Sequence, residues 1–164
     1  MKIEGSCYCK KVSYAVISQT PYPYMHCYCS FCRKTSGSGG YACNIMAQAD
    51  SLKITGEKHL AFHHGFEHDP ESDELIENQN KRYFCKKCAS PLWAHDPRWP
   101  GWLYPFASSI DTTLPKPPEV VHIMLDFAAA WVDVPSGDGH RHFNRYPDES
   151  ILKWHQRLDL YERD

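Results

Sequence analysis

The sequence predicts a mainly β fold, and three observations lead to this prediction. Short runs of apolar and aromatic residues are spread along the 164 residues, and the run at 11–17 alternates its side chains with a period of two. Turn-forming residues separate the runs, as at 37–40, 97–101 and 112–119. The prolines cluster between the runs, where they cost a sheet no ladder hydrogen bond. Short strands with frequent turns are typical of β domains.

Seven runs are expected to form strands. In the first, Val12, Tyr14 and Val16 alternate with Ser13 and Ala15, the pattern of a strand with one buried face. The other six are short and rich in β-branched and aromatic residues, which favour strands. They are residues 41–47, 52–55, 81–85, 91–95, 102–110 and 120–127.

Two segments depart from the strand pattern. Residues 65–80 are polar and acidic and follow neither period, so we expect a long loop there, either a solvated surface insertion or a lid over a site. Residues 148–162 are expected to form a C-terminal helix that packs on the sheets, capped by Asp148 or Ser150. Its apolar stripe is Ile151, Trp154, His155, Leu158 and Tyr161.

Composition and charge narrow the possible partners. Hydrophobic residues make up 42% and charged residues 23% of the chain, which suits a single globular domain over residues 1–164. The formal net charge of −2 disfavours nucleic acid and anionic membranes, because both attract basic surfaces. No apolar run approaches the roughly 20 residues of a membrane span, and the first residues lack the apolar region of a signal peptide. We therefore expect a cytoplasmic protein.

Seven of the eight cysteines fall into three motifs: Cys7/Cys9, Cys27/Cys29/Cys32 and Cys85/Cys88. Thiols stay reduced in the cytoplasm, so these motifs favour metal binding, whereas in a secreted protein eight cysteines would allow four disulfides. Structural zinc takes four ligands, while a reactive zinc often keeps three and an open position. Seven cysteines divide naturally into four and three.

Spacing alone leaves the grouping open. Cys7 and Cys9 could complete a four-cysteine site with Cys27 and Cys29. Alternatively, Cys27, Cys29 and Cys32 could converge on one metal within one turn. The two remaining pairs, Cys7/Cys9 and Cys85/Cys88, would then bind a second metal together. The triplet could also be a closed site with Cys43 or a histidine as fourth ligand. Cys43 lies in the expected strand at 41–47, where a free cysteine commonly packs as a small buried apolar residue. In an extended strand, the side chain of His26 would point away from a metal held by Cys27.

The cysteine motifs and their flanks resemble the family of glutathione-dependent formaldehyde-activating enzymes, which includes relatives of centromere protein V. "GSCYCKKVSY" is similar to the family's G-x-C-x-C-G-x-V, with Lys10 at the usual glycine, and "HCYCSFCRKTSG" to its C-H-C-S-x-C-R-K-x-x-G. "RYFCKKCASPLW" is similar to R-x-F-C-x-x-C-G-x-x-L, with Ala89 at the glycine. The segments "FASSID", which ends at Asp111, and "HIMLDFAAAWVD" continue the similarity, which covers residues 5–131.

The resemblance implies a β-tent fold of small antiparallel sheets around a structural zinc. It implies that Cys7, Cys9, Cys85 and Cys88 bind this zinc and that Cys27, Cys29 and Cys32 hold a second, catalytic zinc. The implied activity is that of a carbon–sulfur lyase, which joins glutathione and formaldehyde to S-(hydroxymethyl)glutathione. The implied partners are thus a small thiol and an aldehyde.

The triplet suits this chemistry. Three thiolates and Zn²⁺ carry a formal charge of −1, so the centre is a weak Lewis acid that leaves a bound thiolate nucleophilic. Arg33 and Lys34 adjoin the triplet and are expected either to contact glutathione or to face solvent, and Asp111 is a third candidate contact. Asp111, His122 and His95 are candidate proton donors. A non-catalytic zinc module that binds a protein partner is the alternative function.

Overall fold

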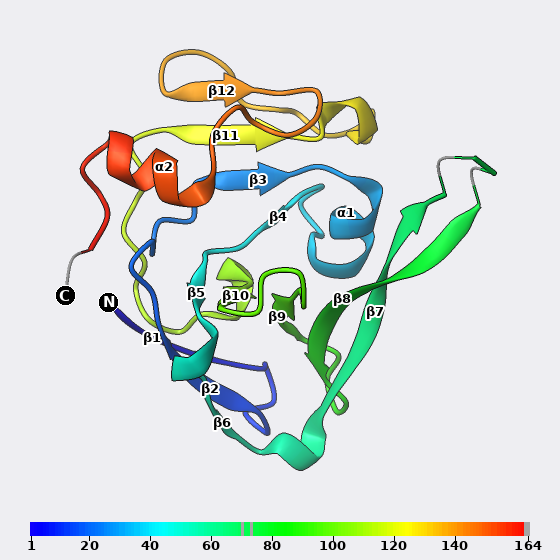
Figure 1. The fold of residues 1–164 in the computed structure, drawn as a ribbon, viewed down its shortest axis with the longest axis vertical. Helices are drawn as coiled ribbons and strands as arrows, with labels where there is room; N and C mark the ends of the chain where they lie inside the picture. Colours follow the sequence, from blue (N-terminus) through cyan, green and yellow to red (C-terminus); the bar gives the residue numbers. More distant parts are fainter. Residues whose placement is uncertain (70, 73, 163–164) are drawn as a thin grey trace.

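The computed structural model describes residues 1–69, 71–72 and 74–162, and in these ranges the predicted mainly β architecture is confirmed. Three small sheets carry the strands, and two α-helices pack at their edges (Figure 1). The first sheet is antiparallel, in the order β1-β2-β6. Its strands are β1 (Lys2–Ser6), β2 (Ser13–Ile17) and β6 (Lys53–Thr55).

The second sheet has five antiparallel strands in the order β5-β10-β9-β8-β7. Its long hairpin, β7–β8, extends past the rest of the sheet on the right of Figure 1. The strands are β5 (Ala47–Gln48), β7 (Leu60–His68), β8 (Leu75–Cys85), β9 (Pro91–His95) and β10 (Trp102–Pro105).

The third sheet is mixed, in the order β12-β11-β3-β4. β11 runs parallel to both β3 and β12, while β3 and β4 are antiparallel. The strands are β3 (Met25–Cys27), β4 (Ala42–Cys43), β11 (Val120–Ile123) and β12 (His140–His142). Because β3 lies between two neighbours, its last residue, Cys27, is fixed by the backbone on both sides.

Three of the predicted strands are interrupted. The run at 41–47 divides into β4 and β5, and the run at 102–110 ends its strand at Pro105 and continues as a 3₁₀ turn, Ala107–Ser109. The run at 120–127 likewise passes from β11 into a 3₁₀ turn, Leu125–Phe127, through Met124 with φ 61°. These turns move the chain from one sheet to another, which period-two reasoning does not reveal.

The expectation of a long loop at 65–80 is wrong for the residues that the structure describes, since most of them belong to the β7–β8 hairpin. Residues 70 and 73 lie outside the described part. Phe66 pairs with Glu77 and Glu67 with Ile76, although all four side chains are exposed. A strand that is solvated on both faces carries no alternation of apolar and polar residues, so the backbone ladder, and not burial, holds this hairpin.

The C-terminal helix is confirmed but is shorter than predicted. Helix α2 spans Ile151–Arg157, and of the two proposed caps Ser150 is the one used, because its side chain accepts a hydrogen bond from the N–H of Lys153. Trp154 is fully buried and stacks on Tyr24 with 3.7 Å between ring centroids. This contact attaches the helix to the third sheet beside β3 and β11.

Helix α1 (Ser30–Ser36) was not predicted. It has only seven residues, and its N-cap is Cys29, whose sulfur accepts a hydrogen bond from the N–H of Cys32 at 3.3 Å. Serine, threonine, aspartate and asparagine are the usual N-cap residues, so a cysteine gives no sequence signal for a helix start.

Within the described ranges, none of the helices has the length and apolar composition that crossing a membrane would require.

Candidate functional site

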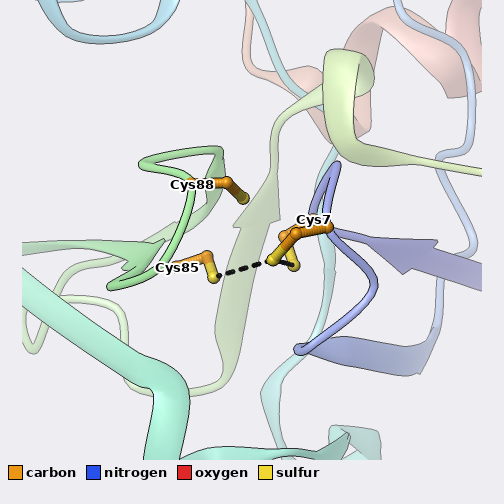
Figure 2. Close-up of side chains that lie close together, drawn as sticks. Cys7, Cys85 and Cys88 are labelled. Carbon is orange, nitrogen blue, oxygen red and sulfur yellow. Dashed lines mark hydrogen bonds between the residues drawn. The ribbon is translucent and has the colours of Figure 1, made fainter.

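Four cysteine side chains from two distant segments meet between the first and second sheets. Cys7 and Cys9 follow β1, Cys85 ends β8, and Cys88 lies in the turn beyond it. Their sulfur atoms all lie within 4.8 Å of one another, with 3.6 Å between Cys7 and Cys9 and 3.8 Å between Cys9 and Cys85. Figure 2 shows Cys85 and Cys88 on one turn facing Cys7 on the other. We call these four residues the cysteine tetrad.

The tetrad fits a structural zinc. Zn–S bonds of about 2.3 Å give a tetrahedron with edges of about 3.8 Å, close to the sulfur–sulfur distances observed here. The N–H groups of Val12 and Lys87 donate to the sulfur atoms of Cys7 and Cys85, at 3.3 and 3.4 Å, and such donors favour thiolates. Burial raises the pKa of Cys88, but hydrogen bonds to its sulfur outweigh this and lower the pKa to about 6.

The two turns that carry the tetrad share a strained position. Lys10 and Ala89 both have φ 58°, the left-handed region that favours glycine, and their N–H groups donate to the carbonyls of Cys7 and Cys85. These are the two positions at which the sequence departs from the glycines of the family motifs. Lys10 and Ala89 therefore adopt the left-handed backbone conformation that glycine would adopt more easily at these positions.

Ala89→Gly should therefore stabilise the protein by about 1 kcal/mol, because a left-handed conformation costs an L-residue roughly 1–2 kcal/mol. For a chain of this size the melting temperature should rise by about 2–4 °C. Thermal unfolding of the zinc-loaded protein measures this. Ala130→Gly is the control, since Ala130 is exposed without a positive φ and the change there should destabilise slightly. A lower melting temperature for Ala89→Gly would contradict the inference that the left-handed conformation of Ala89 destabilises the protein.

Three further cysteines converge where β3 passes into α1. Cys27 ends β3, Cys29 caps α1, and Cys32 lies in its first turn. Their sulfur atoms also lie within 4.8 Å of one another. The predicted local convergence is confirmed, and we call this group the cysteine triplet. Cys32 is buried, while Cys27 and Cys29 are partly exposed, so the group is open to ligands.

The triplet shares its protons unequally. Hydrogen bonds from the thiols of Cys27 and Cys29 hold the pKa of Cys32 well below its usual range, and the Arg82 guanidinium acts in the same direction against burial. The hydrogen bonds that Cys27 makes with Cys29 and Cys32, together with burial, raise the pKa of Cys27. Cysteine sulfur is a soft donor, and three such sulfur atoms suit a thiophilic metal such as zinc, which would bind them as thiolates.

A cavity of about 450 Å³ lies beside the triplet, a size typical of small-molecule sites. Its walls come from β3, the triplet and α1, from the β7–β8 hairpin, and from the segments that contain Asn44, Arg98, Phe127 and Tyr146. At the bulge of the β7–β8 pair, where residues 78–80 of β8 lie opposite Gly65 of β7, Gly65 lies so close to Asn78 that a Cβ there would meet the amide oxygen at 2.7 Å. The polar lining residues beside the triplet are Ser30, Asn44, Glu67, Asn78, Asn80, Arg82, Arg98 and Tyr146.

Arg82 and Arg98 are the cations of this lining, and sequence reasoning named neither as a site residue. Arg82 donates from Nη2 to the sulfur of Cys32 at 3.5 Å. Arg98 is held by Asp96, to which its Nη2 donates at 2.6 Å. Arg82 is the arginine of the motif "RYFCKKC", but the motif alone does not indicate that its side chain reaches the triplet, which the hydrogen bond to Cys32 shows.

The predicted contacts Arg33, Lys34 and Asp111 are not among the described residues that line the cavity. Lys34 is exposed, and Arg33 is partly buried on α1. Asp111 instead lies at the tetrad, where it accepts hydrogen bonds from Ser6 and from Lys10, the latter at 3.3 Å. The structure therefore separates Asp111 from the triplet that it was expected to serve.

The proton donors proposed from the sequence, His122 and His95, are also outside the described lining of the cavity. His122 is fully buried, with Nδ1 2.9 Å from the hydroxyl of Tyr28 and Nε2 2.9 Å from Nδ1 of His140. Burial and the nearby histidines lower the pKa of His122 to about 4. A neutral, hydrogen-bonded histidine supports the packing of β3 against β11.

Cys43 belongs to neither cysteine group, and its strand β4 pairs it with His26. Burial raises the pKa of Cys43 to about 12, so it is a protonated thiol. All eight cysteines lie in the described ranges, and no disulfide joins any of them.

Comparison with known proteins agrees with these clusters. A sequence profile described as "Glutathione-dependent formaldehyde-activating enzyme" matches residues 2–124, which include both cysteine groups. The chain belongs to this family. A Halomonas elongata relative, named "Putative glutathione-dependent formaldehyde-activating enzyme", is 49% identical over 162 residues, or 99% of each chain. Similarity to this member of the glutathione-dependent formaldehyde-activating enzyme family thus extends through helix α2.

Comparison of folds also gives a match among solved structures. A crystal structure of a Rhodobacter sphaeroides protein is similar over 68% of this chain and 91% of that chain, with 19% sequence identity and a TM-score of 0.49.

Proposed function

We propose that this member of the glutathione-dependent formaldehyde-activating enzyme family is a carbon–sulfur lyase of the S-(hydroxymethyl)glutathione synthase type. Its substrates are glutathione, or a similar thiol, and formaldehyde or a related aldehyde. The observation that carries the proposal is the cysteine triplet, which opens into a cavity of suitable size with Arg82 beside it.

Two zinc ions are part of the proposal. Cys7, Cys9, Cys85 and Cys88 would hold a structural ion, and Cys27, Cys29 and Cys32 a second, more weakly bound one. Zinc held by the triplet would supply a Lewis acid, which would favour the thiolate form of a coordinating thiol.

The residues of the chain supply the remaining requirements. Arg82 and Arg98 bring guanidinium N–H donors to the cavity, which suit the two carboxylates of glutathione, while Phe66 and Phe127 give it apolar walls. In the reaction, the thiol sulfur forms a bond to the carbonyl carbon, and the π electrons of the carbonyl move to oxygen. That oxygen takes up a proton to replace the one that the thiol released, so the atoms of both substrates are kept in the product.

Cobalt in place of zinc gives a direct test, because thiolate-to-cobalt absorbance increases with each added sulfur ligand. Glutathione should raise this absorbance, and an analogue with hydrogen in place of the thiol should not. Magnetisation-exchange NMR should show that the protein accelerates adduct formation above the spontaneous rate. An unchanged cobalt spectrum would rule out a thiol at the triplet and with it the proposed activation.

The alternative is a non-catalytic two-zinc module. It would be favoured if glutathione changed the cobalt spectrum without accelerating adduct formation, since thiols add readily to formaldehyde without help. If adduct formed at the same rate with and without the protein, the lyase activity would be rejected, but the evidence for thiol binding at the triplet would stand.

A further inference from the structure

Two buried polar atoms on β8 have no protein partner among the described residues, namely Nε of Arg82 and Oδ1 of Asn80. Most buried polar atoms in folded proteins have a partner, so an exception needs an explanation. Both residues line the cavity at the triplet. Asn80 is the last residue of the β8 bulge, and Arg82 lies two residues further along the regular part of the strand. Together they offer a hydrogen-bond donor and an acceptor to a molecule in the cavity.

Arg82 is held in a fixed position. Its strand has a neighbour on each side, and Arg82 itself pairs with His63 of β7 and Ala94 of β9. The guanidinium carbon lies 4.6 Å from the ring centre of Phe31 and 5.4 Å from that of Phe106. A cation placed in this way keeps its geometry while the charge of a reaction changes, which is the condition for strong electrostatic stabilisation.

We propose that Arg82 is a catalytic residue that stabilises the oxygen of the aldehyde as it becomes an alkoxide, an assignment that rests on the proposed function. Nη2 of Arg82 already donates to Cys32, so a thiol that joined the triplet would have its sulfur near the guanidinium. In the adduct, the oxygen lies only two bonds from that sulfur. The guanidinium N–H groups would therefore reach the oxygen on which negative charge develops.

Electrons and protons balance in this step. The sulfur lone pair forms the new C–S bond, the C–O π bond breaks, and its electron pair becomes the negative charge that Arg82 stabilises. Arg82 serves only as a hydrogen-bond donor, because a guanidinium group has N–H donors and no acceptor. The proton that the thiol releases to water returns through water to the alkoxide oxygen, and the hydroxyl group formed in this way then donates to Oδ1 of Asn80.

Arg82→Lys tests the assignment because lysine keeps the charge and loses the planar fork of donors. The rate of adduct formation above background should fall by about 100-fold, the effect of removing one oxyanion donor. The absorbance change that glutathione causes in the cobalt-substituted protein should stay as in wild type, since the thiol still binds. Guanidinium ion at millimolar concentration should restore part of the rate in Arg82→Ala.

Lys81→Gln is the matched control. Lys81 precedes Arg82 on the same strand, but its ammonium lies over the ring of Phe62, outside the described lining of the cavity. This variant should keep the full rate. An equal loss of rate in Lys81→Gln and Arg82→Lys would mean that any substitution on this part of β8 disturbs the site, and it would overturn the assignment.

The other outcomes separate this assignment from the function on which it rests. Acceleration by wild type and equally by Arg82→Lys would remove Arg82 from catalysis and leave the lyase in place. Loss of the glutathione-dependent cobalt absorbance in Arg82→Lys would make Arg82 a support for the metal ligands and also overturn the proposal. Failure of the wild type to accelerate the reaction would instead reject the lyase itself.

Discussion

Cys85→Ser is expected to release the zinc ion proposed for the tetrad and to lower the free energy of unfolding by about 5 kcal/mol or more. Zinc that binds only the folded chain contributes its binding energy to folding, and structural sites contribute roughly 10 kcal/mol in zinc-finger peptides. Cys85 is fully buried in the main core, and its site joins the turn after β1 to the end of β8. The loss would be a large part of the 5–15 kcal/mol that stabilises a typical domain.

The measurements are metal content and thermal unfolding. For a chain of 164 residues, a loss of about 5 kcal/mol corresponds to a fall in melting temperature of roughly 10–20 °C. Cys43→Ala is the control, because it removes a thiol that lies outside both cysteine groups. The control should keep both zinc ions and lose only about 1 kcal/mol. Equal metal content and an equal melting temperature in Cys85→Ser and wild type would contradict the structural site.

The cysteine groups could be predicted from the sequence because metal-ligand spacing is local. The triplet spans six residues, and each pair of the tetrad spans three or four, so each motif brings its sulfur atoms together without knowledge of the fold. Which pairs meet is a matter of tertiary structure, and here the resemblance to the family decided what spacing left open. The structure brings the same seven residues into the same two groups.

The walls of the cavity could not be predicted in this way. Arg82 reaches Cys32 across fifty residues of sequence, through a contact that depends on the register of β7, β8 and β9. Arg33 and Lys34 were favoured because they are neighbours of the triplet in sequence, but a helix directs successive side chains to different faces. Proximity along α1 was therefore a poor guide to proximity in space.

The β7–β8 hairpin failed to give a strand signal for a related reason. Periodicity reports burial, and the outer part of this hairpin buries little on either face. Its turn is instead stabilised locally, since the carboxylate of Asp69 accepts hydrogen bonds from the N–H groups of Glu71 and Ser72, both at 2.9 Å. The inner part of the hairpin, which includes Asn78, forms a wall of the cavity. The segment therefore does lie at a site, but as paired strands and not as a loop.

Cys29→Ser should abolish the catalysed reaction without unfolding the protein. The sulfur of Cys29 serves twice, as a member of the triplet and as the N-cap acceptor of α1. Serine is a good N-cap residue but a poor ligand for zinc, so the substitution keeps the helix start and removes a metal ligand. The protein should then bind one zinc ion instead of two, with a melting temperature within a few degrees of wild type, and glutathione should no longer change the cobalt absorbance. The catalysed rate should fall to the spontaneous rate.

Cys29→Ala distinguishes the two duties of this residue. Alanine removes both the ligand and the cap, so it should lose the same zinc ion and in addition about 1 kcal/mol of stability relative to Cys29→Ser. A large loss of stability in Cys29→Ser, comparable to that of Cys85→Ser, would mean that the triplet is a second structural site. In that case the two-zinc module would replace the lyase, because an open coordination position would no longer be needed to explain three cysteines on one turn. Retention of both zinc ions by Cys29→Ser would contradict the predicted ligand set.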